Sequence, residues 1–229
     1  MRKSVIGGLV AALLLAVAGI AVAGTKNDVK FETKYTTSRA GAPTGLNTTI
    51  EGAPKDSQGR LDPANRVIIT FERGTKFDTR VPARCSKATL EEQGPNGCPD
   101  RSIVGSGEAE AITGIQSLDP AHEDITAVNT SGGILFYLKG LQTLTLEGKI
   151  RKNKLTVDVP ALPVPGNPKG AVLTKFELKV KRIRRGRRAY ITTPPTCSRG
   201  RWIVRATFQY PNVPDIRNIA SRTRCKRTG

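Results

Sequence analysis

Apolar and polar residues alternate along much of the chain beyond residue 24, and this period of two is typical of strands that bury one face. Residues 29–35, 67–71 and 202–210 show the alternation most regularly. The side chains predicted to face inward are Val29, Phe31 and Tyr35, then Val67, Ile69 and Phe71, and finally Trp202, Val204, Ala206, Phe208 and Tyr210. Residues 132–138, GGILFYL, form a continuous apolar run, which predicts a strand buried on both faces.

Two longer stretches predict β-hairpins. Residues 144–159 alternate on either side of a polar turn near Lys152 and Asn153. Residues 172–192 repeat the pattern around Gly186, a residue type that accepts the backbone conformation of a tight turn. The side chains predicted to face inward are Leu144, Leu146, Leu155, Val157 and Val159 in the first hairpin, and Val172, Phe176, Leu178 and Val180 in the second.

Helical patterns are weak. Residues 123–130 are few and rich in β-branched side chains, and residues 214–224 would support one helical turn at most. Many short strands separated by Gly, Pro and Asn predict an all-β fold, an antiparallel β-sandwich of the Ig-like or jelly-roll-like kind. We expect one such domain over residues 24–229, with a mobile loop around residues 38–65. The proline-rich residues 160–170 would cross within this domain, and a linker between two small domains is the alternative.

The first 23 residues carry the pattern of a secretory signal peptide, which would form a helix ahead of the β-domain. Arg2 and Lys3 precede an apolar run, and Ala21–Ala23 form a small-x-small cleavage signal before Gly24. The apolar run is nearly long enough to span a bilayer, so a retained membrane anchor is the alternative. No later stretch is long and apolar enough to span one. Cleavage would leave a secreted or cell-envelope protein without a transmembrane segment.

The chain has four cysteines, Cys85, Cys98, Cys197 and Cys225. An even number of cysteines in an exported protein predicts disulfides. Zinc sites favour closely spaced cysteine pairs or regularly spaced histidines, and redox sites favour C-x-x-C. The chain has neither pattern, and His122 is its single histidine. Of the three pairings we expect Cys85–Cys98 and Cys197–Cys225, because each closes a local loop, and we expect no metal or cofactor.

Positive charge is concentrated in the C-terminal part of the chain. Residues 149–229 contain 21 basic and 3 acidic residues, whereas residues 24–148 contain 14 basic and 16 acidic residues. The densest stretch, KVKRIRRGRR, lies at the tip of the second predicted hairpin. The cations that we expect to bind a polyanion are Lys179, Lys181, Arg182, Arg184, Arg185, Arg187 and Arg188.

The nature of the polyanion stays open at the level of sequence. Outside a cell the partners include anionic wall polymers, acidic polysaccharides, anionic lipid headgroups and nucleic acid, and charge attracts all of them. Specific nucleic-acid binding is unsupported, because Tyr190 is the one aromatic residue near the basic stretch that could stack on a base. The alternative is that the cations only form a solvated surface.

Candidate catalytic groups are few. His122 is followed by Glu123 and Asp124, but consecutive residues rarely converge on one site, and the chain lacks the G-x-S-x-G nucleophile elbow. Asp119, Glu123 and Asp124 are candidate calcium ligands, although they lack the EF-hand spacing. A glycosidase-like pair of carboxylates stays open. We assign no residue a catalytic role.

Two segments resemble a pattern in uncharacterised secreted proteins of high-GC actinobacteria. In that pattern a cysteine, a variable loop, C-P and a G-x-G strand precede a closing segment with a late cysteine. The residues that carry the resemblance are Cys85, Cys98, Pro99, Gly105, Gly107, Cys197, Trp202, Phe208, Tyr210 and Cys225. The basic residues 179–188 depart from the pattern. The resemblance implies export and an all-β fold, and it implies no catalytic residues.

Two classes of function follow from these observations. The first, which we favour, is a non-catalytic secreted or cell-envelope β-sandwich whose basic hairpin binds anionic surface polymer. The alternative is a secreted hydrolase with a carboxylate-based site. A cleft that holds two or more convergent carboxylates away from the basic hairpin would favour the alternative.

Overall fold

The computed structural model describes residues 24–26, 28–164 and 167–226, and the predicted signal peptide, residues 1–23, lies outside the described residues. The strands are β1 Gly24–Lys26, β2 Val29–Tyr35, β3 Pro43–Thr44, β4 Leu46–Glu51, β5 Arg66–Thr70, β6 Lys76–Phe77, β7 Ile103–Ile112, β8 Ala121–Thr130, β9 Gly133–Lys139, β10 Thr143–Arg151, β11 Lys154–Asp158, β12 Leu162–Val164, β13 Asn167–Val180, β14 Arg184–Arg185, β15 Arg188–Ala189, β16 Ile191–Thr192, β17 Arg201–Gln209 and β18 Ile216–Arg224. The helices are α1 Lys87–Gln93 and the 3-10 helices η1 Pro95–Gly97, η2 Asp100–Ser102 and η3 Ser198–Gly200.

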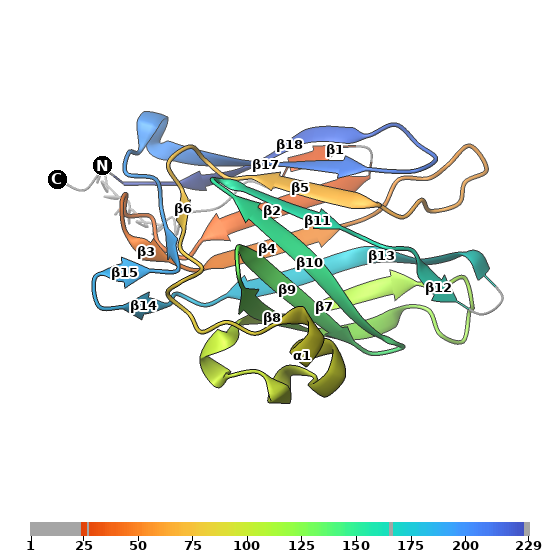
Figure 1. Ribbon diagram of the computed structural model, residues 1–229. Helices are drawn as coiled ribbons and strands as arrows, with labels where there is room; N and C mark the ends of the chain where they lie inside the picture. The colour runs from red at the N-terminus through yellow and green to blue at the C-terminus, as the bar shows by residue number, and fades with distance from the viewer. Residues whose placement is uncertain (1–23, 27, 165–166, 227–229) are drawn as a thin grey trace, which may run out of the picture.

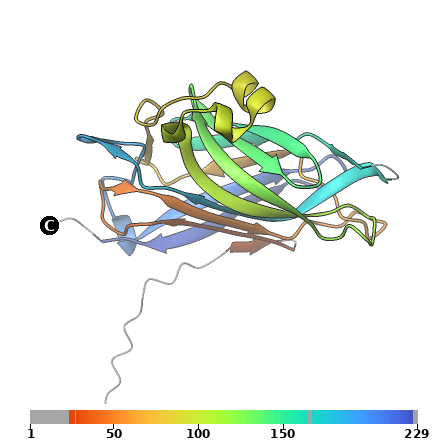
Figure 2. The same cartoon turned by 90° about the horizontal axis from the view of Figure 1, so that it is seen from below.

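Most of the strands form one 13-stranded antiparallel sheet that curls back on itself (Figure 1). The order is β1-β2-β4-β13-β7-β8-β9-β10-β11-β5-β17-β18, and β12 pairs with β13. Figure 2 shows the sheet bending through β7, β8 and β9 over a second layer, and β18 lies alongside β2 and β1. The nearly closed sheet confirms the predicted all-β class. Two smaller sheets, β14-β15 and β3-β16-β6, lie beside it.

Side-chain hydroxyl groups close the seam between the two edges of the large sheet. The N–H of Thr33 on β2 donates to Ser221 Oγ on β18 at 3.0 Å, and the Ser221 hydroxyl donates to the Thr33 carbonyl oxygen at 3.1 Å. The Thr223 hydroxyl donates to the same carbonyl oxygen at 3.2 Å. Thr33 and Ser221 are fully buried, so these bonds satisfy polar groups that water does not reach.

The alternation of apolar and polar residues predicts the core well. The inward-facing side chains predicted on β2 and along residues 202–210 are all buried, from Phe31 at 0% exposed to Tyr210 at 9%. The predicted hairpin at residues 144–159 is also confirmed, because β10 and β11 pair Arg151 with Lys154 across a two-residue turn. Leu146, Leu155, Val157 and Val159 of this hairpin face the same interior as the inward residues of β5, whereas Leu144 packs near Leu162 and Ala171.

The structure differs from the sequence prediction in two segments. The expected loop at residues 38–65 contains β3 and β4, and β4 pairs with both β2 and β13 inside the large sheet. The Asn and Thr residues of β4 made this segment look like a polar loop in the sequence. In the structure β2 and β13 supply its backbone hydrogen bonds, and the outward face of the strand stays polar. Residues 214–224, which by sequence would support one helical turn at most, contain β18 instead, and β18 buries Ile216 and Ile219 in the core. After β11 the chain enters β12, which pairs with the start of β13 in another part of the sheet.

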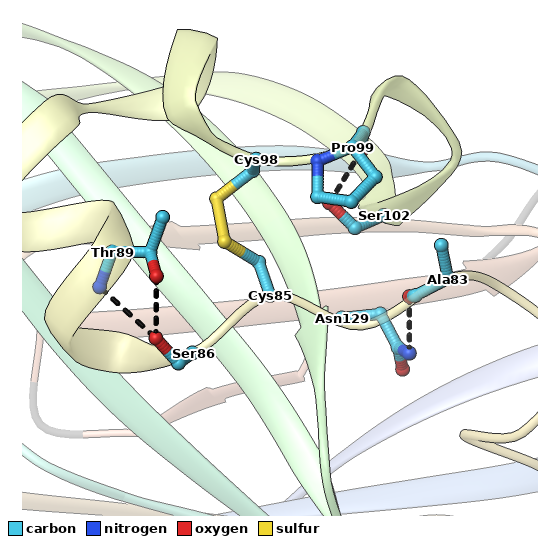
Figure 3. The surroundings of a disulfide bond; sticks show 8 residues. All are labelled: Ala83, Cys85, Ser86, Thr89, Cys98, Pro99, Ser102 and Asn129. Atoms are coloured by element: carbon cyan, nitrogen blue, oxygen red, sulfur yellow. Dashed lines mark hydrogen bonds between the residues drawn. A yellow bond between two sulfur atoms is a disulfide. The ribbon is translucent and has the colours of Figure 1, made fainter.

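Both predicted disulfides are confirmed, and the described residues contain no free cysteine. Cys197–Cys225, with Cα atoms 5.7 Å apart, joins the chain before β17 to the end of β18. Cys85–Cys98, with Cα atoms 5.4 Å apart, closes a surface loop, residues 85–98, which we call the stapled loop (Figure 3). The stapled loop contains α1, which the sequence reasoning missed. Ser86 Oγ caps its start by accepting from the Thr89 N–H at 3.0 Å.

The stapled loop covers the outer face of β8 and β9. Leu90 of α1 is fully buried and packs with Val128 and Leu135 in a cluster separate from the main core. The side-chain amide of Asn129 donates to the carbonyl oxygens of Thr79 and Ala83 and ties the preceding segment to β8. This cover explains why residues 132–138 are apolar on both faces, as the sequence predicts.

Candidate anion-binding site

β14 and β15 form a small hairpin that carries most of the predicted cations (Figure 1). Arg185 pairs with Arg188 across a two-residue turn, and Gly186 enters the turn with a φ of 59°. A Cβ atom added at Gly186 would meet nothing within 4 Å, so the turn projects into solvent. At the base, the N–H of Tyr190 donates to the carbonyl oxygen of Ile183 at 3.0 Å. We call residues 181–188 the basic tip.

The hairpin is smaller than the sequence predicts, because β13 is not one of its arms. β13 ends at Val180 with β4 on one side and β7 on the other. With both edges of β13 occupied, the chain leaves the large sheet before it reverses. Lys179 therefore lies on the outer face of β13, opposite Asn47 and Ser106, and not on the hairpin. The other six predicted cations lie in the basic tip.

Asp78 compensates one cation of the basic tip. Nε and Nη2 of Arg188 both donate to Asp78 Oδ2, at 2.9 and 2.5 Å, and Nε of Arg80 donates to Asp78 Oδ1 at 3.2 Å. Partial burial acts to raise the pKa of Asp78, but the hydrogen bonds from Arg188 and Arg80 outweigh burial and hold that pKa below its usual value. The pair anchors the hairpin to the segment that follows β6.

The remaining cations of the basic tip are exposed and lack a compensating charge. Within the described ranges, no acidic side chain lies at ion-pair distance from Lys181, Arg182, Arg184, Arg185 or Arg187. Like charges held this close repel one another, and a bound anion would relieve the repulsion. The tip is therefore electrostatically prepared for a negatively charged partner.

An open hollow beside Asp78 gathers a second set of cations. Its volume is about 880 Å³, and we call it the basic hollow. Its charged lining residues are Arg73, Lys76, Asp78, Arg80, Arg84 and Lys152. They come from the chain around β6 and from the turn between β10 and β11. Because Asp78 also binds Arg188, the basic hollow adjoins the basic tip.

Sequence reasoning missed the basic hollow, although residues 72–84, ERGTKFDTRVPAR, carry a signal for it. Four basic residues there stand three or four positions apart, but Glu72 and Asp78 make the stretch look balanced. The structure removes both acids from the balance. Glu72 turns to β17, where its Oε2 accepts the N–H of Ile203 at 2.8 Å, and Asp78 is occupied by Arg188.

Tyr190, the aromatic residue considered for base stacking, is unsuited to that role. Its side chain is 1% exposed and belongs to the main core, and burial raises its pKa. A base cannot stack on a ring that is covered by protein. The basic tip therefore has no aromatic platform from this tyrosine, and the chemistry that it offers is positive charge and hydrogen-bond donors.

A second hollow lies on the outer face of β7, β8 and β13 and has a volume of about 370 Å³. Its ionisable lining residues are Glu108, Glu110, His122, Glu123, Asp124, Lys139 and Lys175. Strand register places Glu108 opposite Asp124. We call this the acidic hollow, and it supplies the convergent carboxylates named above as the feature that favours a hydrolase. Lys175 lies 3.4 Å from Glu110 and 3.2 Å from Glu177, so part of the negative charge is neutralised.

The three candidate calcium ligands lie in different environments and do not converge on one site. Asp119 accepts hydrogen bonds from the backbone and hydroxyl of Thr113 and from the N–H of Gly114, at 2.5 to 3.0 Å. Glu123 is buried and Asp124 is exposed, on opposite faces of β8. Burial raises the pKa of Glu123, and Oε2 of this residue has no hydrogen-bond partner in the described part of the chain. The described residues contain no cluster arranged to hold a metal ion.

Comparison of the chain with protein-family models, with curated proteins and with solved structures finds no match in any of the three. The resemblance to secreted actinobacterial proteins therefore stays a prediction. Nowhere in the described ranges does a helix have the length and hydrophobicity needed to cross a membrane. The structure defines an all-β, disulfide-bonded protein with a concentrated cationic surface.

Proposed function

We propose that this protein is a non-catalytic, extracytoplasmic protein that binds anionic polymer through the basic tip and the basic hollow. The observation that supports the proposal is the set of five exposed tip cations without an acidic partner, beside a hollow lined by five further cations. Arginine suits such a site, because its planar guanidinium group binds phosphate or carboxylate oxygens in pairs.

A polymer fits this surface better than a small anion. The cations are exposed and spread over a protruding hairpin and an open hollow, so no single anion can contact most of them. A chain with repeating negative groups can contact many at once, with each contact weak and screened by salt. Wall polymers with phosphate groups and acidic polysaccharides both have this chemistry.

The place of action is part of the proposal. Disulfides persist in oxidising compartments, and both predicted disulfides are present in this fold. Together with the predicted signal peptide, the disulfides support secretion or residence in the cell envelope. An envelope protein would meet anionic polymer at high local concentration, where weak binding suffices.

The proposal is tested by retention of the purified protein on immobilised polyphosphate and on an immobilised acidic polysaccharide across a salt gradient. Replacement of Arg184, Arg185 and Arg187 by Ser should make the protein elute at clearly lower salt on at least one matrix. A second variant with Arg73, Lys76 and Arg84 changed to Ser tests the basic hollow in the same way. Both variants should keep their melting temperature, because the changed side chains are exposed.

A matched variant removes the same charge elsewhere. Arg205, Arg222 and Arg224 are exposed residues of β17 and β18 outside the basic tip and basic hollow. Their replacement by Ser lowers the net charge equally and should shift elution much less than the tip variant. Equal shifts in the two variants would show that net charge alone governs retention, which would overturn the tip as a binding site.

A secreted hydrolase is the second candidate function, and the acidic hollow is the observation that favours it. Glu108 and Asp124 face each other there, and a pair of carboxylates is the minimum for acid–base hydrolysis of a glycosidic bond. The test is release of reducing ends from neutral and acidic polysaccharides by the purified protein. Activity that disappears in both Glu108→Gln and Asp124→Asn, and persists in the tip variant, would establish this function; no release would remove it.

A further inference from the structure

The curled sheet encloses an apolar cavity of about 140 Å³. Strands from both layers contribute to its walls, including β4, β5, β10, β11 and β13. Several apolar side chains that face it are only partly buried, among them Ile50, Val67, Leu155 and Phe176. Protein interiors are normally packed without voids of this size, so the cavity is a feature that needs an explanation.

The polar side chains in the walls are few: Thr48, Thr174, Lys175 and the two tyrosines Tyr190 and Tyr210. The Thr48 hydroxyl bonds to the Thr33 hydroxyl at 3.0 Å, and the Thr174 hydroxyl donates to the Glu110 carbonyl oxygen at 3.4 Å. The ammonium group of Lys175 is held by carboxylates on the outer face of the sheet. An ordered water needs two to four polar partners, and the threonine and lysine groups are already bonded to other residues. The other lining residues are predominantly aliphatic and aromatic, so the cavity favours an apolar occupant.

The lining of the cavity is extended along the strands. It runs from Leu46 at the start of β4 to Gly52 just after its end, which corresponds to roughly 20 Å of extended chain. A volume of about 140 Å³ spread over such a length leaves a small cross-section. A fused-ring molecule would need the two layers to separate, whereas an unbranched chain of methylene groups matches the shape.

We propose that the interior of the sheet binds one unbranched alkyl chain. The walls supply aliphatic and aromatic contacts along the whole chain, and burial of the methylene groups drives binding. The chain can belong to a free fatty acid or to a lipid, since both present the same alkyl group. This site is independent of the basic tip, and its occupancy does not require binding of anionic polymer.

The proposal is tested by NMR of the purified protein with labelled Ile and Leu methyl groups. Dodecanoate and a lysophosphatidylcholine with a dodecanoyl chain are titrated separately, with 1-naphthol as the ring-shaped comparison. Saturable shifts are expected for the methyl groups of Ile69, Ile134 and Leu155, which line the cavity. Leu90 and Leu135 lie in the separate cluster under the stapled loop and should not shift. Binding of dodecanoate alone identifies a free acid, and binding of the lysolipid identifies a lipid chain.

Variants test whether the methyl-group shifts arise from binding inside the cavity. Leu155→Trp fills the space and should weaken dodecanoate binding at least tenfold, and Ile150→Phe serves if that variant does not fold. Thr156→Trp, one position along on the opposite face of β11, should bind as the wild type does. Unchanged binding by the filled variants, shifts that include Leu90, or a preference for 1-naphthol would each overturn the proposal.

Discussion

Trp202 and Tyr35 meet edge to face in the core, with ring centroids 5.2 Å apart and planes inclined at 73°. The indole N–H of Trp202 donates to the Thr196 carbonyl oxygen at 2.8 Å, and the Tyr35 hydroxyl bonds to the Thr75 hydroxyl at 2.7 Å. Tyr35 belongs to β2 and Trp202 to β17, two strands near opposite edges of the sheet. The ring contact therefore joins the two edges from the inside.

Loss of this contact should destabilise the protein strongly. We expect Trp202→Ala to lower the free energy of unfolding by about 3 to 5 kcal/mol, because a fully buried ring is replaced by a cavity. Tyr35→Phe keeps the ring and removes one hydrogen bond, so about 1 kcal/mol is expected. Urea denaturation of both variants measures the difference. A Trp202→Ala change no larger than that of Tyr35→Phe would contradict the packing described here.

The stapled loop should depend on its disulfide. Replacement of Cys85 and Cys98 by Ala removes a 13-residue cross-link, which the chain-entropy model values at roughly 3 kcal/mol. Hydrogen exchange should rise first in α1 and on β8 and β9, whose outer face the loop covers. Replacement of Cys197 and Cys225 is the comparison, and its effect should centre on β17 and β18. Uniform exchange in the first variant would argue against a local cover.

Asp78 should restrain anion binding, because it neutralises Arg188. Asp78→Asn should raise the salt concentration at which the protein leaves a polyphosphate matrix, with Asp215→Asn, which frees Arg217 instead, as the control. The pKa of Asp78 is lowered in the fold, so its ion pair contributes stability above the unfolded pKa of about 3.9. That contribution is lost as the pH falls through the folded pKa. Lower retention of Asp78→Asn would contradict this role.

Glu123 gives the opposite dependence on pH. Burial raises the pKa of Glu123 in the folded state, so the fold favours the protonated acid and loses stability as the pH rises from the unfolded pKa of about 4.3 through the folded pKa. Glu123→Gln should flatten this part of the curve of melting temperature against pH. Asp124→Asn removes a neighbouring negative charge that also raises the pKa of Glu123, so it should reduce the slope without abolishing it. Glu147→Gln, at an exposed residue of β10, is the control and should retain the wild-type slope. A wild-type slope in Glu123→Gln would mean that the carboxylate is accommodated as an anion.

Cleavage of the predicted signal peptide is checked by N-terminal sequencing of the protein from culture medium and from the envelope fraction. We expect a chain that starts at Gly24, because Ala21–Ala23 match the small-x-small cleavage signal. A chain that starts at Met1 and stays with the membranes would favour the retained anchor.

The sequence predicts those parts of the fold that depend on local pattern. Strict alternation identifies the inward faces of β2, β5 and β17, and short loop length identifies both disulfides. The turn at Lys152 and Asn153 is local as well. The strand faces and the turn depend on stretches of about ten residues. The disulfides depend on cysteines that have few alternative partners.

Features that depend on distant partners were missed. After Val180 the chain leaves the large sheet and reverses in the hairpin of β14 and β15. It does so because β4 pairs with the edge of β13 that the expected hairpin would have used. The basic hollow combines the chain around β6 with the turn at Lys152, and nothing in either segment indicates the other. The ring contact between Trp202 and Tyr35 joins strands that are far apart in the sequence, so the alternation along β17 alone could not indicate it.

The hydroxyl-bonded seam has a consequence for self-association. An antiparallel sheet with free edges offers unpaired N–H and C=O groups to other chains, and such edges promote aggregation. Here β1 covers the start of β2, and Ser221 and Thr223 occupy the backbone of Thr33 further along. Each edge of the large sheet thus shields the other at this point. If the protein is concentrated on anionic polymer as proposed, the shielded edges make it less able to add strands to its neighbours, and crowding there is not expected to produce fibres.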